Sequence, residues 1–286
     1  MTVTILRTNK RFGFIAITAM IGVTCITLLL SACVSNPLTG KSTMAFVGNN
    51  QLFPQSFAAY EEFLNENIVI TGTADAAMVD RVGRRLAEAA QKWLASDGNE
   101  HYLDDYRWEY KLVDDDTVNA WCMPGGKIVV YTGILPVTQT EEGLAVVLGH
   151  EISHALLNHG QQNMSAGLLQ QLGAIGLMIG LGATDMSEDA QGLAILGYML
   201  ASQIAGTLPF SRSHESEADH YGLMLMAIAG YNPDAAPPFW ERMTAAAGGG
   251  SLEFLSTHPS NTTRIRQLRG WASEAREKAA GFGVRF

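Results

Sequence analysis

The chain has 286 residues, of which 19 are Lys or Arg and 28 are Asp or Glu, so its formal net charge at pH 7 is −9. Nucleic-acid binding depends on clustered basic side chains that neutralise phosphates, and this acidic balance excludes nucleic acid as a partner. A chain of this length can bury a substantial core within a single domain.

The first 32 residues have the layout of an export signal. Basic Arg7, Lys10 and Arg11 precede an apolar run over residues 12–30, and small residues follow just before Cys33. This ending resembles a lipobox, which predicts that Cys33 is lipidated and begins the mature chain. An uncleaved membrane anchor is the alternative, because a run of about 20 apolar residues can cross a bilayer.

Three segments are therefore expected: a lipoprotein signal peptide over residues 1–32, a lipidated N-terminus and tether over 33–52, and one globular domain over 53–286. Only Cys122 remains inside that domain, so no internal disulfide is predicted. Val34, and not Asp, follows the lipid site, which in bacterial lipoproteins directs sorting to the outer membrane. We expect a lipid-anchored envelope protein at the periplasmic face of that membrane.

The predicted elements are mainly helical. Apolar residues at helical spacing predict helices over 53–65, 74–94, 141–158, 213–229, 235–247 and 261–278. Alternation predicts short strands over 108–113, 119–123 and 127–131, with a turn at 124–126 joining the last two. The expected fold class is α+β, mainly helical, with a small sheet.

Two apolar stretches, 168–181 and 193–204, flank a group of acidic residues. Each is shorter than the roughly 20 residues that a membrane-spanning helix requires. A buried or surface-capping helical hairpin is therefore expected. A hairpin embedded in a membrane is the alternative.

The pentapeptide over residues 150–154 has the pattern H-E-x-x-H on a predicted helix. Positions four residues apart lie about 40° apart around a helix, so His150 and His154 can converge on one ion. Glu151 lies one step around, where its carboxylate can take a proton from water at the metal. The flanking residues are almost all apolar, and buried imidazoles are costly unless they are satisfied. The pattern predicts a zinc site with an open position for water.

A carboxylate from elsewhere must complete that site. Glu215 and Asp219 are four residues apart on another predicted helix and share one face, whereas Glu217 lies about 200° from Glu215. We interpret Glu215 as the third ligand and Asp219 as the acceptor for the N–H of a ligand imidazole. A solvated acidic helix start is the alternative.

The other histidines near these motifs are expected to lie outside the site. His159 follows His154 by five residues, about 140° around a continuous helix, and should face away. His214 and His220 are off the ligand face of their helix and are expected at the surface.

These motifs resemble the gluzincin family that includes the CAAX prenyl endopeptidases, the bacterial heat-shock membrane protease HtpX and the Oma-type proteases. The resemblance covers nearly all of the chain after the signal and is strongest to a periplasmic lipoprotein branch. It is carried by H-E-I-S-H at 150–154, E-S-E-A-D at 215–219, N-A-W-C-M-P-G-G-K-I-V-V-Y-T-G at 119–133, and a weaker match at 256–259 before Arg264.

The resemblance implies a zincin-like metallopeptidase domain, with one Zn²⁺ per chain, Glu215 as third ligand and a small edge sheet beside the H-E-x-x-H helix. An edge strand can hold an extended protein or peptide substrate by backbone pairing. Asn119 would then face the cleft, and Gly125 with Gly126 would form the tight turn.

His258 and Arg264 have less specific expectations. His258 either stabilises an oxyanion, occupies the open zinc position in a resting state, or is a loop histidine bonded to the backbone. Arg264 is expected to form a structural ion pair with Asp219 or Glu217.

The function implied is zinc-dependent hydrolysis of peptide bonds in exported or envelope proteins, as protein quality control, with Glu151 as general base. One alternative is a non-enzymatic outer-membrane assembly factor or chaperone that retains the metal site. The other is a protease embedded in the inner membrane through the 168–204 hairpin.

Overall fold

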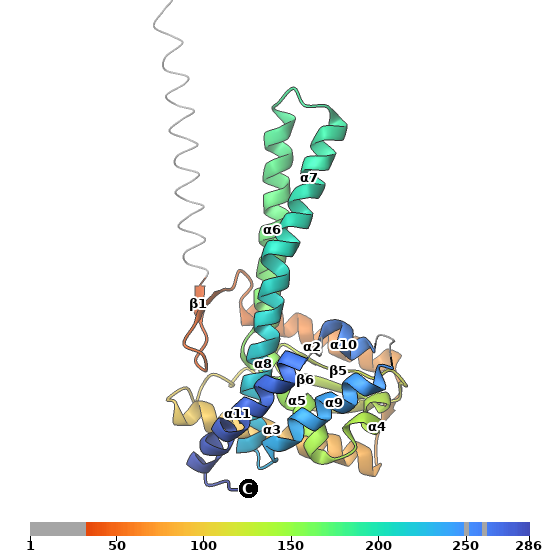
Figure 1. The fold of residues 1–286 in the computed structure, drawn as a ribbon, viewed down its shortest axis with the longest axis vertical. Helices are drawn as coiled ribbons and strands as arrows, with labels where there is room; N and C mark the ends of the chain where they lie inside the picture. Colours follow the sequence, from red (N-terminus) through yellow and green to blue (C-terminus); the bar gives the residue numbers. More distant parts are fainter. Residues whose placement is uncertain (1–32, 249–251, 259–261) are drawn as a thin grey trace, which may run out of the picture.

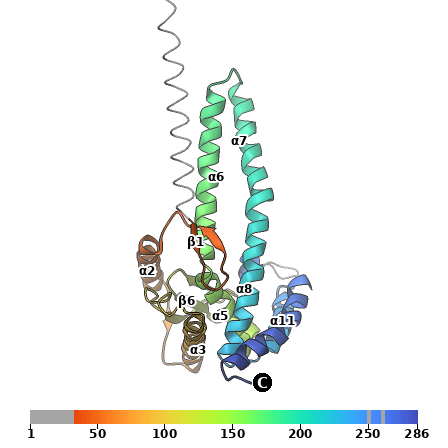
Figure 2. The same ribbon diagram turned by 90° about the vertical axis from the view of Figure 1, so that its left-hand side faces the viewer.

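The computed structural model describes residues 33–248, 252–258 and 262–286. A compact helical body carries a long helical hairpin that projects from it (Figure 1, Figure 2). The helices are α2 (Asn49–Glu66), α3 (Ala74–Ser96), α4 (Leu135–Thr138), α5 (Glu141–Leu156), α6 (His159–Gly182), α7 (Glu188–Ser202), α8 (Leu208–Ile228), α9 (Ala236–Ala246), α10 (Glu253–Thr257) and α11 (Thr262–Gly281). Shorter helical turns are η1 (Thr132–Ile134), the π-helical η2 (Gln203–Thr207) and η3 (Pro233–Ala235).

A four-stranded sheet packs on the body in the order β3 (Val69–Ile70), β4 (Glu109–Val113), β6 (Lys127–Tyr131) and β5 (Ala120–Met123). Strands β4 and β6 are parallel, and the other two pairs are antiparallel. The three predicted strands are present, and β3 is an addition that the sequence pattern did not indicate. The predicted class, α+β and mainly helical, is confirmed.

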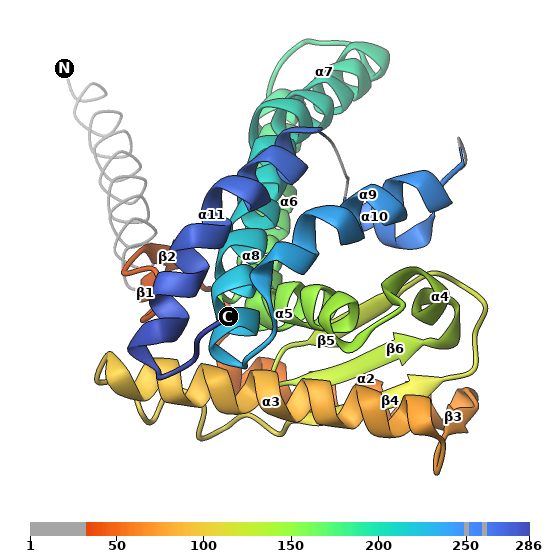
Figure 3. The same cartoon turned by 60° about the horizontal axis from the view of Figure 1, so that its bottom comes forward.

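Helix α5 occupies the centre of the body, in contact with α3, α8 and β5 (Figure 3). Every residue from Gly143 to Ser153 is buried. This burial on all sides explains why the helix is apolar around its whole circumference, since no face has to meet water. Polar side chains on α5 therefore need partners from neighbouring elements.

The segment expected to be a tether is structured. Strands β1 (Cys33–Ser35) and β2 (Ser42–Met44) form an antiparallel pair, and Asn36 between them donates from Nδ2 to the carbonyl of Leu156 at 2.8 Å. The hydroxyl of Tyr221 donates to the carbonyl of Leu38 at 3.2 Å, which joins the segment to α8. The predicted signal over 1–32 lies outside the described residues, and lipidation of Cys33 stays a prediction.

The helical hairpin differs from its prediction. Helix α6 continues for 24 residues, and the second arm runs without a break from Glu188 to Ile228. None of the residues in α7 is buried, so the hairpin is neither buried nor a cap on the surface. One polar contact joins the two arms: Gln170 Nε2 donates to Ser202 Oγ at 2.7 Å.

Candidate metal centre

Helix α5 presents its two histidines on one face. Thr140 caps the N-terminus, where its Oγ1 accepts from the N–H of Gly143 at 3.1 Å. One turn separates His150 from His154, and their Nε2 atoms lie 3.1 Å apart. Two imidazole nitrogens that converge in this way, with His150 fully buried, form one half of a donor group.

Helix α8 crosses α5 closely enough to complete that group. A Cβ at Gly149 would lie 2.9 Å from the carbonyl oxygen of Gly222, so both positions require glycine for the two backbones to approach. This approach places Glu215 beside the histidines, with Oε2 3.4 Å from His150 Nε2 and Oε1 3.3 Å from His154 Nε2.

His258 joins the same cluster from the end of α10. Its Nδ1 lies 3.0 Å from Glu215 Oε2 and 3.1 Å from His150 Nε2. Of the three expectations for His258, the loop histidine bonded to the backbone does not describe its ring, which lies in the cluster; only its backbone N–H donates to the backbone, to the Phe254 carbonyl at 2.9 Å. One donor atom from each of His150, His154, Glu215 and His258 lies within 4.8 Å of the others.

The Asp219 carboxylate and the Arg264 guanidinium contact the Nδ1 side of the His150 ring. Asp219 Oδ1 lies 2.9 Å from His150 Nδ1 and accepts from Arg264 Nη2 at 2.6 Å. The Arg264 guanidinium also stacks over Trp240, 3.5 Å from the ring centroid. Asp219 thus has the position expected of an acceptor that orients His150, and Arg264 makes the ion pair with Asp219.

His159 does not face away, contrary to the prediction. Helix α5 ends at Leu156, and Asn158 adopts a left-handed conformation with φ 58° before α6 begins. This break turns His159 back, so that its Nδ1 lies 2.9 Å from His154 Nδ1. Its Nε2 lies 3.3 Å from Glu217 Oε2, and Glu217 pairs with Lys41.

Helical spacing did not predict these contacts of His159, because the turn at Asn158 interrupts the helix. The available signal was Asn158 directly before His159, since Asn tolerates a left-handed conformation and commonly ends a helix. His214, expected at the surface, is also buried and stacks on His159 with ring centroids 4.0 Å apart. Burial lowers the pKa of His214 to about 3, so its ring is neutral.

The protonation states suit a cation. Burial lowers the pKa of His154 well below its usual range, which leaves a neutral ring with a free lone pair. Burial alone would raise the pKa of Glu215, but hydrogen bonds from His150, His154 and His258 outweigh it and hold the pKa well below normal. Burial lowers the pKa of His150, but hydrogen bonds to Asp219 and Glu215 outweigh it and raise the pKa to about 9, so a cation that binds at its Nε2 displaces a proton. A carboxylate and imidazoles around one point are the donor set that divalent transition metals take.

Glu151 lies beside this group without belonging to it. Burial raises the pKa of its carboxyl group. Oε1 has no hydrogen-bond partner within the described residues, and the nearest His258 nitrogen, Nε2, is 3.4 Å away. A buried, unsatisfied carboxylate oxygen beside a donor cluster is available to accept a proton from a molecule that enters the site.

The expected substrate strand borders the site. Strand β5 lies at the edge of the sheet, against α5. Gly125 and Gly126 form its turn with φ of 85° and 92°, a conformation that favours glycine. Asn119, just before β5, donates from Nδ2 to Glu253 Oε1 at 2.9 Å, and so contacts α10, the helix that His258 follows.

Comparison with known proteins agrees with this arrangement. The model of peptidase family M48 matches residues 74–272. The chain is 42% identical over 178 residues to the mitochondrial metalloendopeptidase OMA1 of Schizosaccharomyces pombe, and the match covers 62% of this chain and 50% of that protein. It is 33% identical over 207 residues to OMA1 of Saccharomyces cerevisiae, with 70% and 56% covered. It is 30% identical over 175 residues to the beta-barrel assembly-enhancing protease of Escherichia coli, with 59% and 35% covered.

The chain spans about half the length of the mitochondrial relatives it matches. These relatives also correct the predicted location. Because two of them are mitochondrial by name, the placement at the periplasmic face of a bacterial outer membrane is wrong. The predicted location rested on Val34. The residue after a lipid site affects sorting only in a chain that is lipidated, and lipidation of Cys33 stays a prediction. The lipoprotein branch stays a prediction.

Proposed function

Because the chain belongs to peptidase family M48, we propose that it is a zinc-dependent endopeptidase that hydrolyses peptide bonds of membrane-associated proteins. The observation that carries this proposal is the convergence of His150, His154 and Glu215, with the unsatisfied carboxylate of Glu151 beside them. Protein quality control is the role that fits such an activity.

The donor set supports one zinc ion per chain. Two neutral imidazoles and a carboxylate are the ligands of many catalytic zinc sites, which keep one position open. His150, His154 and Glu215 would hold the ion, and Asp219 would fix the tautomer of His150 by accepting from Nδ1. His258 supplies the fourth donor, and we propose that it occupies the open position in a resting state.

When bound, zinc supplies a Lewis acid that acidifies water and polarises a carbonyl group. Glu151 accepts the proton of the attacking water and passes it to the leaving amine. Its raised pKa suits both steps, because a general base that must also act as an acid works best with a pKa nearer neutrality. Strand β5 aligns an extended substrate by backbone pairing, since an edge strand has unpaired N–H and C=O groups.

The test is Glu151→Gln, compared with Glu142→Gln on the same helix. The change at Glu151 removes the base and no zinc ligand, so hydrolysis of unfolded casein should fall at least about a hundredfold. Zinc content measured by mass spectrometry should stay at one ion per chain. Glu142→Gln should cleave at the wild-type rate, and a chelator should stop cleavage by every variant.

Cleavage by Glu151→Gln at the wild-type rate would remove Glu151 from the mechanism. A wild-type protein that binds zinc and cleaves neither casein nor a denatured membrane protein would instead support the non-enzymatic assembly factor. The geometry favours the enzyme, because an assembly factor has no need of a buried, unsatisfied carboxylate oxygen beside the donor group.

A further inference from the structure

The helical hairpin has a charge distribution unlike that of helices in water. Its arms, residues 160–184 and 190–211, contain no Asp, Glu, Lys or Arg. Acidic and basic residues occur only at the tip, as Asp185, Glu188 and Asp189, and again at the root from Arg212 onward. Both ends of the hairpin are therefore polar, and everything between them is uncharged.

The arms are also mostly apolar on every side, and Gln171 and Gln203 are the exposed polar exceptions in their middle parts. No residue from Ala166 to Leu208 is buried, and Ile179, Leu193 and Ile204 are 71%, 69% and 66% exposed. A helix that is apolar all round belongs in a protein core or in a membrane, and this one lies outside the core. A protein partner would cover one stripe of such a hairpin and leave the others in water.

The length of the arms matches the thickness of a bilayer. The first turns of α6 pack on the body, and the 17 residues from Ala166 to Gly182 project from it; at 1.5 Å per residue they span about 26 Å, close to the thickness of an acyl core, about 30 Å. The uncharged part of the second arm is at least as long. The acidic tip can thus reach the far headgroups while the root stays on the near side.

Contacts between the arms are of the kind found inside membranes. Gln170 bonds to Ser202 from one arm to the other, which satisfies two polar side chains away from water. Gly173 faces Tyr198 so closely that a Cβ there would lie 1.9 Å from the Tyr198 hydroxyl. The helical backbone satisfies its own hydrogen bonds, as a lipid environment requires.

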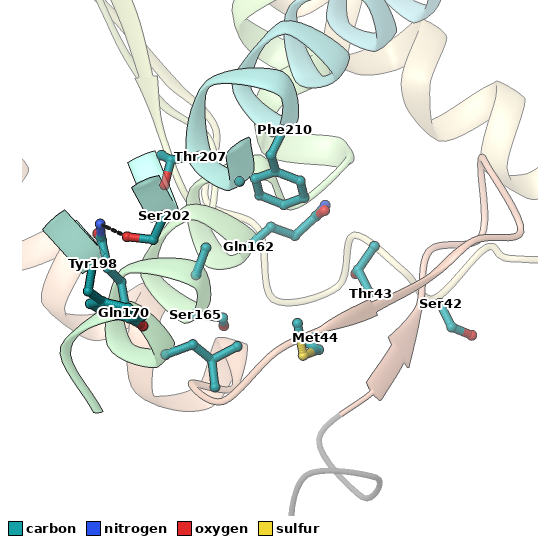
Figure 4. Close-up of a pocket in the computed structure, with 13 residues that line it drawn as sticks. Ser42, Thr43, Met44, Gln162, Ser165, Gln170, Tyr198, Ser202, Thr207 and Phe210 are labelled. Carbon is teal, nitrogen blue, oxygen red and sulfur yellow. Dashed lines mark hydrogen bonds between the residues drawn. The ribbon is translucent and has the colours of Figure 1, made fainter. Parts of the chain in front are cut away.

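The root of the hairpin continues the apolar surface down to the body. A pocket of about 500 Å³ opens there between β2, α6 and the start of α8 (Figure 4). Met44, Leu169, Tyr198 and Phe210 are among the side chains that line it. The root also carries the candidate site, because α6 begins at His159 and Glu215 lies three residues after Arg212.

We propose that the hairpin of α6 and α7 inserts across a lipid bilayer and holds the candidate metal centre at the membrane surface. The partner is the lipid itself, since a surface that is apolar on all sides, uncharged and of bilayer length has no single face to dock. The site would then meet protein segments that lie next to the membrane. This last step rests on the proposed function.

The test uses the full chain in phosphatidylcholine vesicles that contain a trace of lipid with a photoreactive diazirine in its acyl tail. After illumination, peptide mapping should find labels concentrated in residues 166–184 and 190–208. Insertion of residues 1–32 cannot produce this result, because the labels are located by peptide. Labels absent from both arms, or cross-links between the arms of two copies in place of lipid labels, would overturn the proposal.

A matched pair of variants tests the apolar surface directly. Ile175→Asp with Leu200→Asp places a charge near mid-depth on each arm, which is costly in lipid and harmless in water. Labelling of the arms should fall several-fold. Ile68→Asp, at a site on the body that is 70% exposed, should label as the wild type does. Equal labelling of both variants would contradict insertion.

Two further outcomes separate the hairpin from the enzyme. Glu151→Gln should label as the wild type does, because the hairpin does not depend on hydrolysis. A chain that cleaves casein in detergent and never labels in vesicles would refute insertion and leave the proposed function standing. If the metal centre lies at the membrane surface, a peptide tethered to vesicles should be cleaved several-fold faster than the same peptide free in solution. The variant with two Asp substitutions should lose that preference.

Discussion

The imidazoles of His154 and His159 face each other through their Nδ1 atoms, 2.9 Å apart, across the junction of α5 and α6. One of the two nitrogens must donate, and His159 is itself held at Nε2 by Glu217. This contact orients the His154 ring through its Nδ1 atom, in the same way that Asp219 orients the ring of His150. Each histidine of the H-E-x-x-H motif has its own support, and the two supports come from different elements.

The support of His154 predicts the effect of His159→Phe. An aromatic ring is kept and the hydrogen bond is lost, so zinc affinity should fall by about 10- to 100-fold, the usual cost of losing such a partner. Competition with a chelator measures the affinity. His220→Phe, on α8 but outside the cluster, is the control. Wild-type affinity in His159→Phe would show that His154 needs no second partner.

The pair of Asp219 and Arg264 predicts a difference between buried and exposed ion pairs. Asp219→Ala leaves the buried Arg264 guanidinium without this carboxylate, and should lower the free energy of unfolding of the zinc-free chain by about 3 kcal/mol. Asp80→Ala removes the exposed partner of Arg84 and should change nothing measurable. Urea unfolding compares the two, and equal midpoints would be inconsistent with the burial of Arg264.

The crossing of α5 and α8 predicts a strict requirement for glycine. In Gly149→Ala the new Cβ meets the backbone of Gly222, which cannot rotate away, so the helices must separate. We expect a loss of about 1–3 kcal/mol, the usual cost of overpacking, together with weaker zinc binding. Gly270→Ala on α11 has open space and should stabilise by about 0.5–1 kcal/mol. Calorimetry gives both values, and a neutral Gly149→Ala would mean that the crossing can relax.

The N-terminus of α5 predicts a pH dependence of stability. A hydrogen bond from Arg81 lowers the pKa of Glu141 below 4.5. Because the folded pKa lies below the unfolded one, the contribution is complete above the unfolded pKa and is lost as the pH falls through the folded pKa. Glu141→Gln should thus melt about 1–3 °C lower than the wild type near neutral pH, and the gap should close as the pH falls through the folded pKa. A gap that stays constant in acid would rule out the carboxylate as its source.

The sequence by itself determined the parts of the site that depend on spacing within one helix. Residues four apart share a helical face whatever surrounds the helix, so His150 with His154, and Glu215 with Asp219, could be paired from their numbers alone. The family could also be recognised, because its motifs are short and local. The three strands near the site followed from alternation in the same way.

Only the tertiary structure decided which elements meet. His159 turned toward His154 because one left-handed residue broke the helix, and spacing cannot be extended across such a break. His258 reached the donor group over a long separation along the chain. The same apolar residues would suit a buried or an exposed hairpin. Hydrophobicity gives only the preference of a side chain for leaving water and does not say what covers that side chain. The tertiary structure places the arms outside the body, since no residue of α7 is buried.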